Sequence, residues 1–204
     1  MVLIQLKILA FCILEHSLLK NIIKYDIIYF GIDSVDSDTG KRVDRYKVYN
    51  KYIISCDNVS SESIDTLRFR HDVPWGKMIR HSLVVNNNIH FGETRFCNDT
   101  LFSTLTALNA VNIYADRTPF YCVTERTGSL ITHSTLNAYF IRYEVILKKN
   151  MILRKAGYAK HQLPIANFLK NISRFGIIPF LKAIKLGLSY NANFFIGYKN
   201  WFKK

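Results

Sequence analysis

Residues 98–123, NDTLFSTLTALNAVNIYADRTPFYCV, decide the fold class of this 204-residue chain. Leucines recur at helical spacing in the first part of this stretch and predict a helix over residues 100–110. The apolar and aromatic runs 111–114 and 120–123 predict two strands around a turn at residues 116–119. A helix that alternates with apolar strands is typical of an α/β protein.

The same alternation extends outward from this stretch. Residues 25–30, YDIIYF, are β-branched or aromatic apart from Asp26 and predict a buried strand, which a short helix over residues 17–23 precedes. A helical turn at residues 80–86 and a short strand at residues 89–91 are expected before residue 98, and another helix over residues 134–149. The fold class that we predict is therefore α/β.

Composition sets the class of protein and of partner. A hydrophobic fraction of 49% is that of a globular chain with its own core, and the formal net charge is +13. From Arg142 onward the sequence contains 13 Lys and Arg residues and a single acidic residue, Glu144, which gives this part a net charge of +12. Such a block of basic residues favours a polyanionic partner. The alternative is that these residues simply form a solvent-exposed surface of the protein, as runs of charged residues commonly do.

The cysteines and the amino-terminal residues indicate no metal site, disulfide framework or signal peptide. Cys12, Cys56, Cys97 and Cys122 are scattered without a Cys-x-x-Cys pair, which indicates neither a zinc site nor a disulfide framework and fits a reducing cytoplasm. Residues 1–16 are apolar but lack the basic leader and the small-residue cleavage site of a signal peptide. This segment matches no element that we can place.

Asp99 poses the central question about the function. It stands where the predicted helix begins, and Asp is among the preferred residues at a helix N-cap. A carboxylate at the edge of an apolar helix is also suited to general-base chemistry. The two roles are compatible, because backbone amides and the helix macrodipole favour the ionised carboxylate that a base requires.

The order of motifs around Asp99 resembles the carboxyl-terminal half of a family 2 glycosyltransferase catalytic domain. The resemblance covers about residues 17–160, and it rests on the order and spacing of the elements rather than on any single one. The elements that carry the resemblance are Trp75, Lys77 and Arg80; Asn87, Asn88, Ile89, Phe91 and Glu93; Asn98 and Asp99; Pro119, Phe120 and Tyr121; and Arg126 and Ser129.

The resemblance implies a glycosyltransferase A-type fold, Rossmann-like with a mixed sheet, that transfers a sugar from a nucleotide-diphosphate donor with inversion. Asp99 would then be the general base that removes the proton of the acceptor hydroxyl. Asn98 replaces the Glu that usually precedes the base, and its amide could hydrogen-bond a sugar hydroxyl. Surface polysaccharides such as capsule or O-antigen are the products of such enzymes, with a glycan or lipid-linked acceptor.

Four further residues are substrate-binding candidates on this mapping. Trp75 and Lys77 would line the acceptor cleft, although a Trp beside a Pro is as often a core residue. Arg126 and Ser129 lie in a loop that borders the active site in the family, where Arg could contact a diphosphate or an anionic acceptor. A solvent-facing Arg126 is the competing interpretation.

The resemblance also implies a part that we do not find in the chain. Family members carry an amino-terminal nucleotide-binding half whose Asp-x-Asp holds a divalent metal, Mg or Mn. The elements at residues 17–30 resemble those that follow this motif, which predicts an amino-terminally truncated domain. Asp36-Ser37-Asp38 matches Asp-x-Asp by letter only, because it lies in a charged, Gly-closed loop after a strand. No metal ligand is therefore assigned.

Residues 161–204 form a basic tail after the predicted catalytic part, residues 17–160. Ile165, Phe168, Leu169 and Ile172 share one helical face, and Leu181, Ile184 and Leu188 repeat this arrangement among lysines. A basic amphipathic helix suits an anionic membrane surface, which would place the protein at the cytoplasmic face of the membrane. The alternative is a helix that packs in the core of the protein. No recognised motif supports nucleic acid as the partner.

Two functions are therefore carried forward. The first is a family 2-like glycosyltransferase. The second is an inactive truncated remnant, or a non-enzymatic basic protein that binds a membrane surface.

Overall fold

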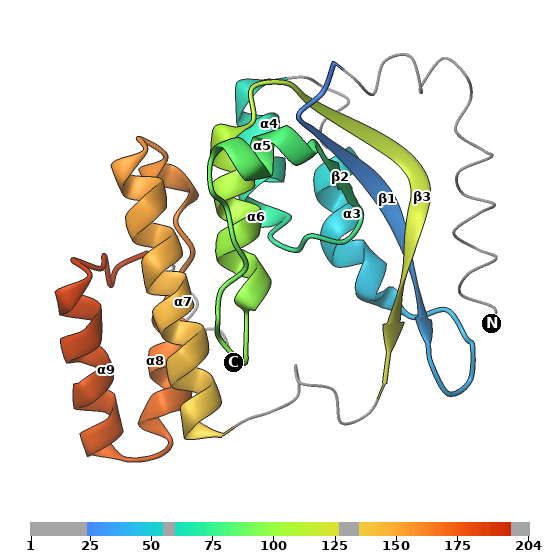
Figure 1. The fold of residues 1–204 in the computed structure, drawn as a ribbon. Helices are drawn as coiled ribbons and strands as arrows, with labels where there is room; N and C mark the ends of the chain where they lie inside the picture. Colours follow the sequence, from blue (N-terminus) through green and yellow to red (C-terminus); the bar gives the residue numbers. More distant parts are fainter. Residues whose placement is uncertain (1–23, 55–59, 127–134, 197–204) are drawn as a thin grey trace. The chain divides into compact units, whose positions relative to one another are not determined.

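The computed structural model describes residues 24–54, 60–126 and 135–196, and Figure 1 shows their course. Contacts within the chain define two compact units, which we describe separately. Unit 1 contains the described residues of 24–89 and 109–126, and unit 2 contains those of 90–108 and 135–196.

Unit 1 is built on a three-stranded mixed sheet. The central strand β1 (Ile27–Asp36) pairs with β2 (Lys77–Ile79) in the antiparallel sense and with β3 (Ile113–Glu125) in the parallel sense. The helical segments of the unit are η1 (Asp44–Tyr46), α3 (Lys47–Ile54), α4 (Ser61–Arg70) and α5 (His81–Asn86). This mixed sheet with its helices confirms the α/β class.

β1 is buried on both of its faces. Ile27 and Tyr29 pack with residues of α3 and α4 in one core cluster, whereas Ile28 and Phe30 belong to a second cluster with Met78 and Phe120. Side chains of a strand alternate between the two faces of a sheet. Burial on both faces explains why residues 27–30 are apolar without alternation.

β3 differs from the prediction, because it is one strand from residue 113 to residue 125 rather than two strands around a turn. The register with β1 shifts on both sides of Gly31, where Asp116 and Pro119 face consecutive residues of β1. Pro119 has no N–H to donate, so the residues that suggested a turn instead form a bulge within the strand. The predicted strand at residues 89–91 is also absent, and irregular backbone occupies residues 89–97.

Unit 2 is helical. It contains α6 (Asn98–Asn109), whose last residue is counted with unit 1, and α7 (Leu136–Lys155), η4 (Ala159–His161), α8 (Ala166–Ser173) and α9 (Ile177–Ser189). The helices predicted at residues 100–110 and 134–149 are thereby confirmed, and the second extends further than expected. The helix predicted at residues 17–23 lies outside the described residues.

The apolar face of α8 corrects one prediction about the tail. Ile165, Leu169 and Ile172 are buried in a core cluster with Tyr143, Ile146 and Leu147 of α7, and Phe168 packs against the same cluster. This face is therefore covered by protein, and the prediction that it lies in a membrane is wrong. No helix of the described residues is both long enough and apolar enough to span a membrane.

Candidate functional site

The start of α6 presents Asp99, the predicted base. Cys97, directly before the helix, has a left-handed backbone with φ 55°, and the Thr100 N–H donates to the Cys97 carbonyl over 3.2 Å. The helix begins at Asn98, so Asp99 lies half-buried inside its first turn and is not the N-cap that the sequence suggested. The positive end of the helix dipole therefore lies beside a carboxylate that solvent or a ligand can reach.

The loop before α6 holds this helix start in place. The Gly92 N–H donates to the Asn98 carbonyl over 2.8 Å, and a Cβ added at Gly92 would lie 3.3 Å from that oxygen. Next to it, the ring of Phe91 stacks on the ring of Phe102, with centroids 4.0 Å apart. The small residue and the aromatic stack let the loop close tightly over Asn98, whose side chain stays exposed.

Trp75 lies in an aromatic cluster of unit 1. Its ring stacks on Tyr121 with a 5.8 Å centroid distance and meets Tyr49 edge-on at 4.7 Å, while the Arg45 guanidinium lies 6.0 Å from its centroid. Trp75 is half-buried, and Tyr121 is 42% exposed. Such a partly exposed pair of rings with a nearby cation can stack a sugar ring or a base.

Gly76 fixes the backbone next to Trp75. It has φ +71°, and its carbonyl accepts the Phe30 N–H of β1 over 2.8 Å. A Cβ at Gly76 would meet Ile32 at 2.7 Å, so both the conformation and the space require glycine. The segment that carries Trp75 is thus attached directly to the central strand.

Lys77 is engaged within unit 1. Its ammonium donates to the His71 carbonyl over 2.6 Å and lies 4.9 Å from the centroid of the Tyr29 ring. The imidazole of His71 is fully buried, and this burial, together with the charge of Lys77, lowers the pKa of His71 to about 3. Lys77 therefore has a structural role, and its predicted contact with substrate stays a prediction.

Arg80, another residue of the resemblance, joins the ends of the strands. Its guanidinium donates to the Tyr25 carbonyl and lies 3.5 Å from the Asp26 carboxylate, which accepts the N–H groups of Val111 and Asn112 at 2.9 Å each. Burial acts to raise the pKa of Asp26, but these hydrogen bonds and Arg80 bring it below its ordinary value. The side chain of Arg80 stabilises the sheet.

Asp36-Ser37-Asp38 forms a self-contained turn. One carboxylate oxygen of Asp36 accepts the N–H of Asp38 over 3.1 Å and the N–H and hydroxyl of Thr39 over 2.7 and 2.8 Å. Hydrogen bonds from Thr39 lower the pKa of Asp36. The described part of the chain contains no group of three or more His, Cys, Asp and Glu residues that could hold a metal ion.

The predicted site residues fall in different parts of the structure. Trp75, Lys77 and Arg126 belong to unit 1, where Arg126 is exposed just after β3, whereas Asn98 and Asp99 belong to unit 2. Ser129 lies outside the described residues.

The sequence did not indicate three neighbours of Trp75, namely Arg45, Tyr49 and His71. It also predicted no helix at residues 47–54 or 61–70. The sequence signal that could have identified this region is the three Tyr residues that closely follow Arg45, at positions 46, 49 and 52.

The structure thus defines an α/β protein with a half-buried carboxylate in the first turn of α6 and an aromatic cluster beside its sheet. Neither a family model nor a curated protein matches the chain. Among solved structures it is similar to the crystal structure of S. aureus TarS 1-349 in complex with UDP-GlcNAc, with 18% sequence identity and a TM-score of 0.49. The similarity covers 84% of this chain and 53% of that one, so the chain spans about half the length of that structure.

Proposed function

We propose that the chain is the catalytic part of a family 2-type glycosyltransferase, with Asp99 as the general base. The observation that carries the proposal is the position of Asp99, half-buried in the first turn of α6 and preceded by the tight turn at Cys97. The motif order in the sequence supports it independently, because the acidic residue falls at the helix start where the resemblance places the base.

The proposed reaction is an inverting displacement. The Asp99 carboxylate accepts the proton of the acceptor hydroxyl while the hydroxyl oxygen bonds to the anomeric carbon of the donor sugar. The bond from that carbon to the diphosphate breaks, and the nucleoside diphosphate leaves with the electron pair. A carboxylate beside a helix N-terminus suits this role, since its ionised form is favoured before the acceptor binds.

The substrates are proposed by class. The donor is a nucleotide-diphosphate sugar, and the acceptor is a glycan or lipid-linked glycan of surface polysaccharide synthesis, such as capsule or O-antigen, at the cytoplasmic face of the membrane. Trp75 with Tyr121 would stack a ring of the substrate, while Asn98 would hydrogen-bond a sugar hydroxyl. Arg126 and Ser129 would contact a phosphate or an anionic acceptor group.

Family members use Mg or Mn at the donor diphosphate. The described residues offer no ligand set for this ion. In the one Asp-x-Asp match, a carboxylate oxygen of Asp36 already accepts hydrogen bonds from the N–H and the hydroxyl of Thr39. The proposal therefore contains no step that passes through a metal.

Donor binding tests the proposal. Isothermal titration calorimetry of the chain with a panel of nucleotide-diphosphate sugars, each with and without Mg²⁺ or Mn²⁺, should show saturable binding of at least one donor. The free nucleoside monophosphates are the control, since they lack the diphosphate and the transferable sugar. A complete lack of donor binding would remove the enzymatic function for this chain and favour the alternative, a non-enzymatic basic protein.

A further inference from the structure

The exposed side of α9 is apolar where a surface helix is normally polar. Ile177, Ile178, Leu181 and Leu188 are 66%, 65%, 58% and 61% exposed. On the opposite side of the same helix, Ala183 is buried in the core of unit 2 and Gly187 packs closely against Tyr143. A helix that is apolar on both sides is expected to be covered on both sides.

Three of these residues form one stripe along α9, and Ile178 lies beside it. At 3.6 residues per turn, Ile177, Leu181 and Leu188 project within about 40° of one another. Phe175, in the turn that joins α8 to α9, is also exposed and extends the stripe beyond the first residue of the helix. A continuous exposed apolar patch of this kind marks an interaction surface.

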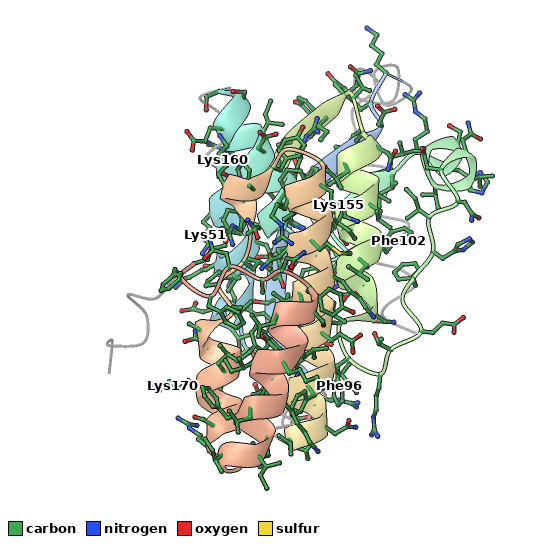
Figure 2. All side chains as sticks on the ribbon, turned by 90° about the vertical axis from the view of Figure 1, so that its left-hand side faces the viewer. Lys51, Phe96, Phe102, Lys155, Lys160 and Lys170 are labelled. Atoms are coloured by element: carbon green, nitrogen blue, oxygen red, sulfur yellow. The ribbon has the colours of Figure 1, made fainter. Side chains whose placement is uncertain are left out.

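All charged residues of α8, α9 and the turn between them are basic. Lys182 and Lys185 stand on the same side of α9, Arg174 precedes the turn, and Lys170 lies on α8, where Figure 2 marks it; all four are exposed. No Asp or Glu occurs in the sequence after Glu144. We refer to these four basic residues together with the apolar stripe as the α9 surface.

We propose that the α9 surface docks on an anionic lipid bilayer, with the aliphatic side chains in the interfacial region and the basic side chains at the headgroups. The lysines at positions 182 and 185 each follow an apolar residue by four positions, so their stems can run along the stripe while their ammonium groups reach the phosphates. This proposal does not depend on the transferase function.

Charge argues for a bilayer over the other occupants. A symmetric dimer through the α9 surface would bring Lys182 and Lys185 against their own copies, with no acid after residue 144 to pair with them. The phosphates of a nucleic acid would pair with the basic residues, but its bases would not pack on exposed Ile and Leu side chains, because the bases of single strands stack on aromatic rings. An anionic bilayer matches both the aliphatic and the basic residues.

Point variants test the surface better than truncation does, because removal of the residues after Leu163 would also remove Ile165, Leu169 and Ile172 from the core. Flotation with vesicles of phosphatidylcholine, alone and mixed in equal parts with phosphatidylglycerol, measures binding of the full chain. The apolar variant is Ile178→Gln with Leu181→Gln, and the charge variant is Lys182→Gln with Lys185→Gln. Val85→Gln, at an exposed apolar position of α5, is the matched control.

The unmodified chain and Val85→Gln should bind the anionic vesicles, and binding should weaken as salt is added. The apolar variant should bind at least about tenfold more weakly at every salt concentration, since two interfacial aliphatic side chains are lost. The charge variant should lose a similar factor at low salt and show a shallower salt dependence. Circular dichroism should report an unchanged helix content for both variants.

Four results would overturn the proposal. The first is the absence of binding to anionic vesicles, and the second is equal binding by the apolar variant and the unmodified chain. The third is a dimer in sedimentation velocity that Leu181→Gln dissociates, which would assign the surface to a second copy. The fourth is tight binding of single-stranded RNA that the charge variant loses and the apolar variant keeps, together with vesicle binding that neither variant alters.

Discussion

The position of Asp99 connects local structure with the proposed chemistry. The residue lies inside the first turn of α6, where the loop at Gly92 and the left-handed Cys97 set the direction of the helix start. A helix terminus of this kind stabilises a negative charge whether or not the carboxylate reacts. Stability measurements alone therefore cannot separate a helix-stabilising residue from a base, whereas turnover can.

Replacement of Asp99 by Asn should lower the rate of sugar transfer by about 100-fold or more while donor affinity stays the same, because the amide cannot accept the proton of the acceptor hydroxyl. Release of nucleoside diphosphate, measured under saturating donor, checks the rate. The change should also cost about 0.3–1 kcal/mol of stability through the helix dipole. Glu62→Gln, which removes a carboxylate from the first turn of α4, is the control and should leave turnover unchanged. An Asp99→Asn protein with full turnover would leave Asp99 with the helix-stabilising role alone.

His71 should make the stability of unit 1 depend on pH. Its pKa is about 3 in the folded protein, where burial and Lys77 disfavour the charged ring, against an ordinary value of 6.5. Above pH 6.5 both states hold a neutral ring and the full stability is present. As the pH falls below 6.5 the unfolded chain takes up a proton first, so about 2 kcal/mol should be lost by pH 5.

Urea denaturation at a series of pH values from 7 to 5 measures this loss, and His71→Phe should remove it while keeping an aromatic ring among Tyr29, Tyr49 and Trp75. Asp26 and Glu144 do not obscure the effect, because their pKa values are already below 3.8 and 4.5, so their contributions are lost only under more acidic conditions. An identical slope in His71→Phe would assign the pH dependence to other groups.

At the scale of the elements, the pairing of β1 with β3 depends on one glycine. A Cβ at Gly31 would overlap the carbonyl oxygen of Arg117, because the bulge of β3 brings its backbone against β1 at this point. The close approach explains why a glycine stands between the large apolar residues Phe30 and Ile32 of β1.

Gly31→Ala should therefore lower the free energy of unfolding by about 1–3 kcal/mol through backbone displacement at the bulge. Thermal or urea denaturation measures the change. Gly40→Asn is the control, because no atom lies within 4 Å of an added Cβ there and Asn tolerates the φ of +67°. Equal stability of Gly31→Ala and the unmodified protein would mean that the bulge relaxes without cost.

At the scale of the whole molecule, the chain has separate hydrophobic cores in its two units. One is centred on β1, and the other lies among α7, α8 and α9. Within unit 2, the Asn150 side chain exchanges two hydrogen bonds with the backbone of Leu163, at 2.7 and 2.8 Å, and holds the segment before α8 against α7. The described part of the basic tail, residues 161–196, is therefore an integral part of a folded unit.

Leu169→Ala should destabilise unit 2 by about 2–5 kcal/mol, since a fully buried side chain leaves a cavity between α7 and α8. Hydrogen exchange should show lost amide protection in α7, α8 and α9, with β1 retaining its protection. Leu188→Ala on the exposed side of α9 is the matched control and should change stability by no more than about 0.5 kcal/mol. A parallel loss of protection in β1 would show that the two units unfold together.

How far the sequence predicted the structure depended on the range of the interactions. The helices at residues 98–109 and 136–155 and the buried strand β1 follow from local periodicity and composition, and each was predicted within a few residues at its amino-terminal end. α3 and α4 were missed because their residues are rich in Ser, Tyr and charged side chains, which carry little apolar periodicity. The site residues were assigned from motif order alone, and their roles stay predictions.

The sequence by itself determined the α/β class and, to within two residues, the first residue of α6, because helix and strand periods are local properties. Only the tertiary structure decided that the turn-like residues 116–119 form a bulge, that His71 is buried, and that α8 is covered by protein while the outer side of α9 is exposed. The physical reason is that a local apolar pattern shows which face of an element is buried. The residues that bury this face come from distant parts of the chain, so the pattern does not identify them.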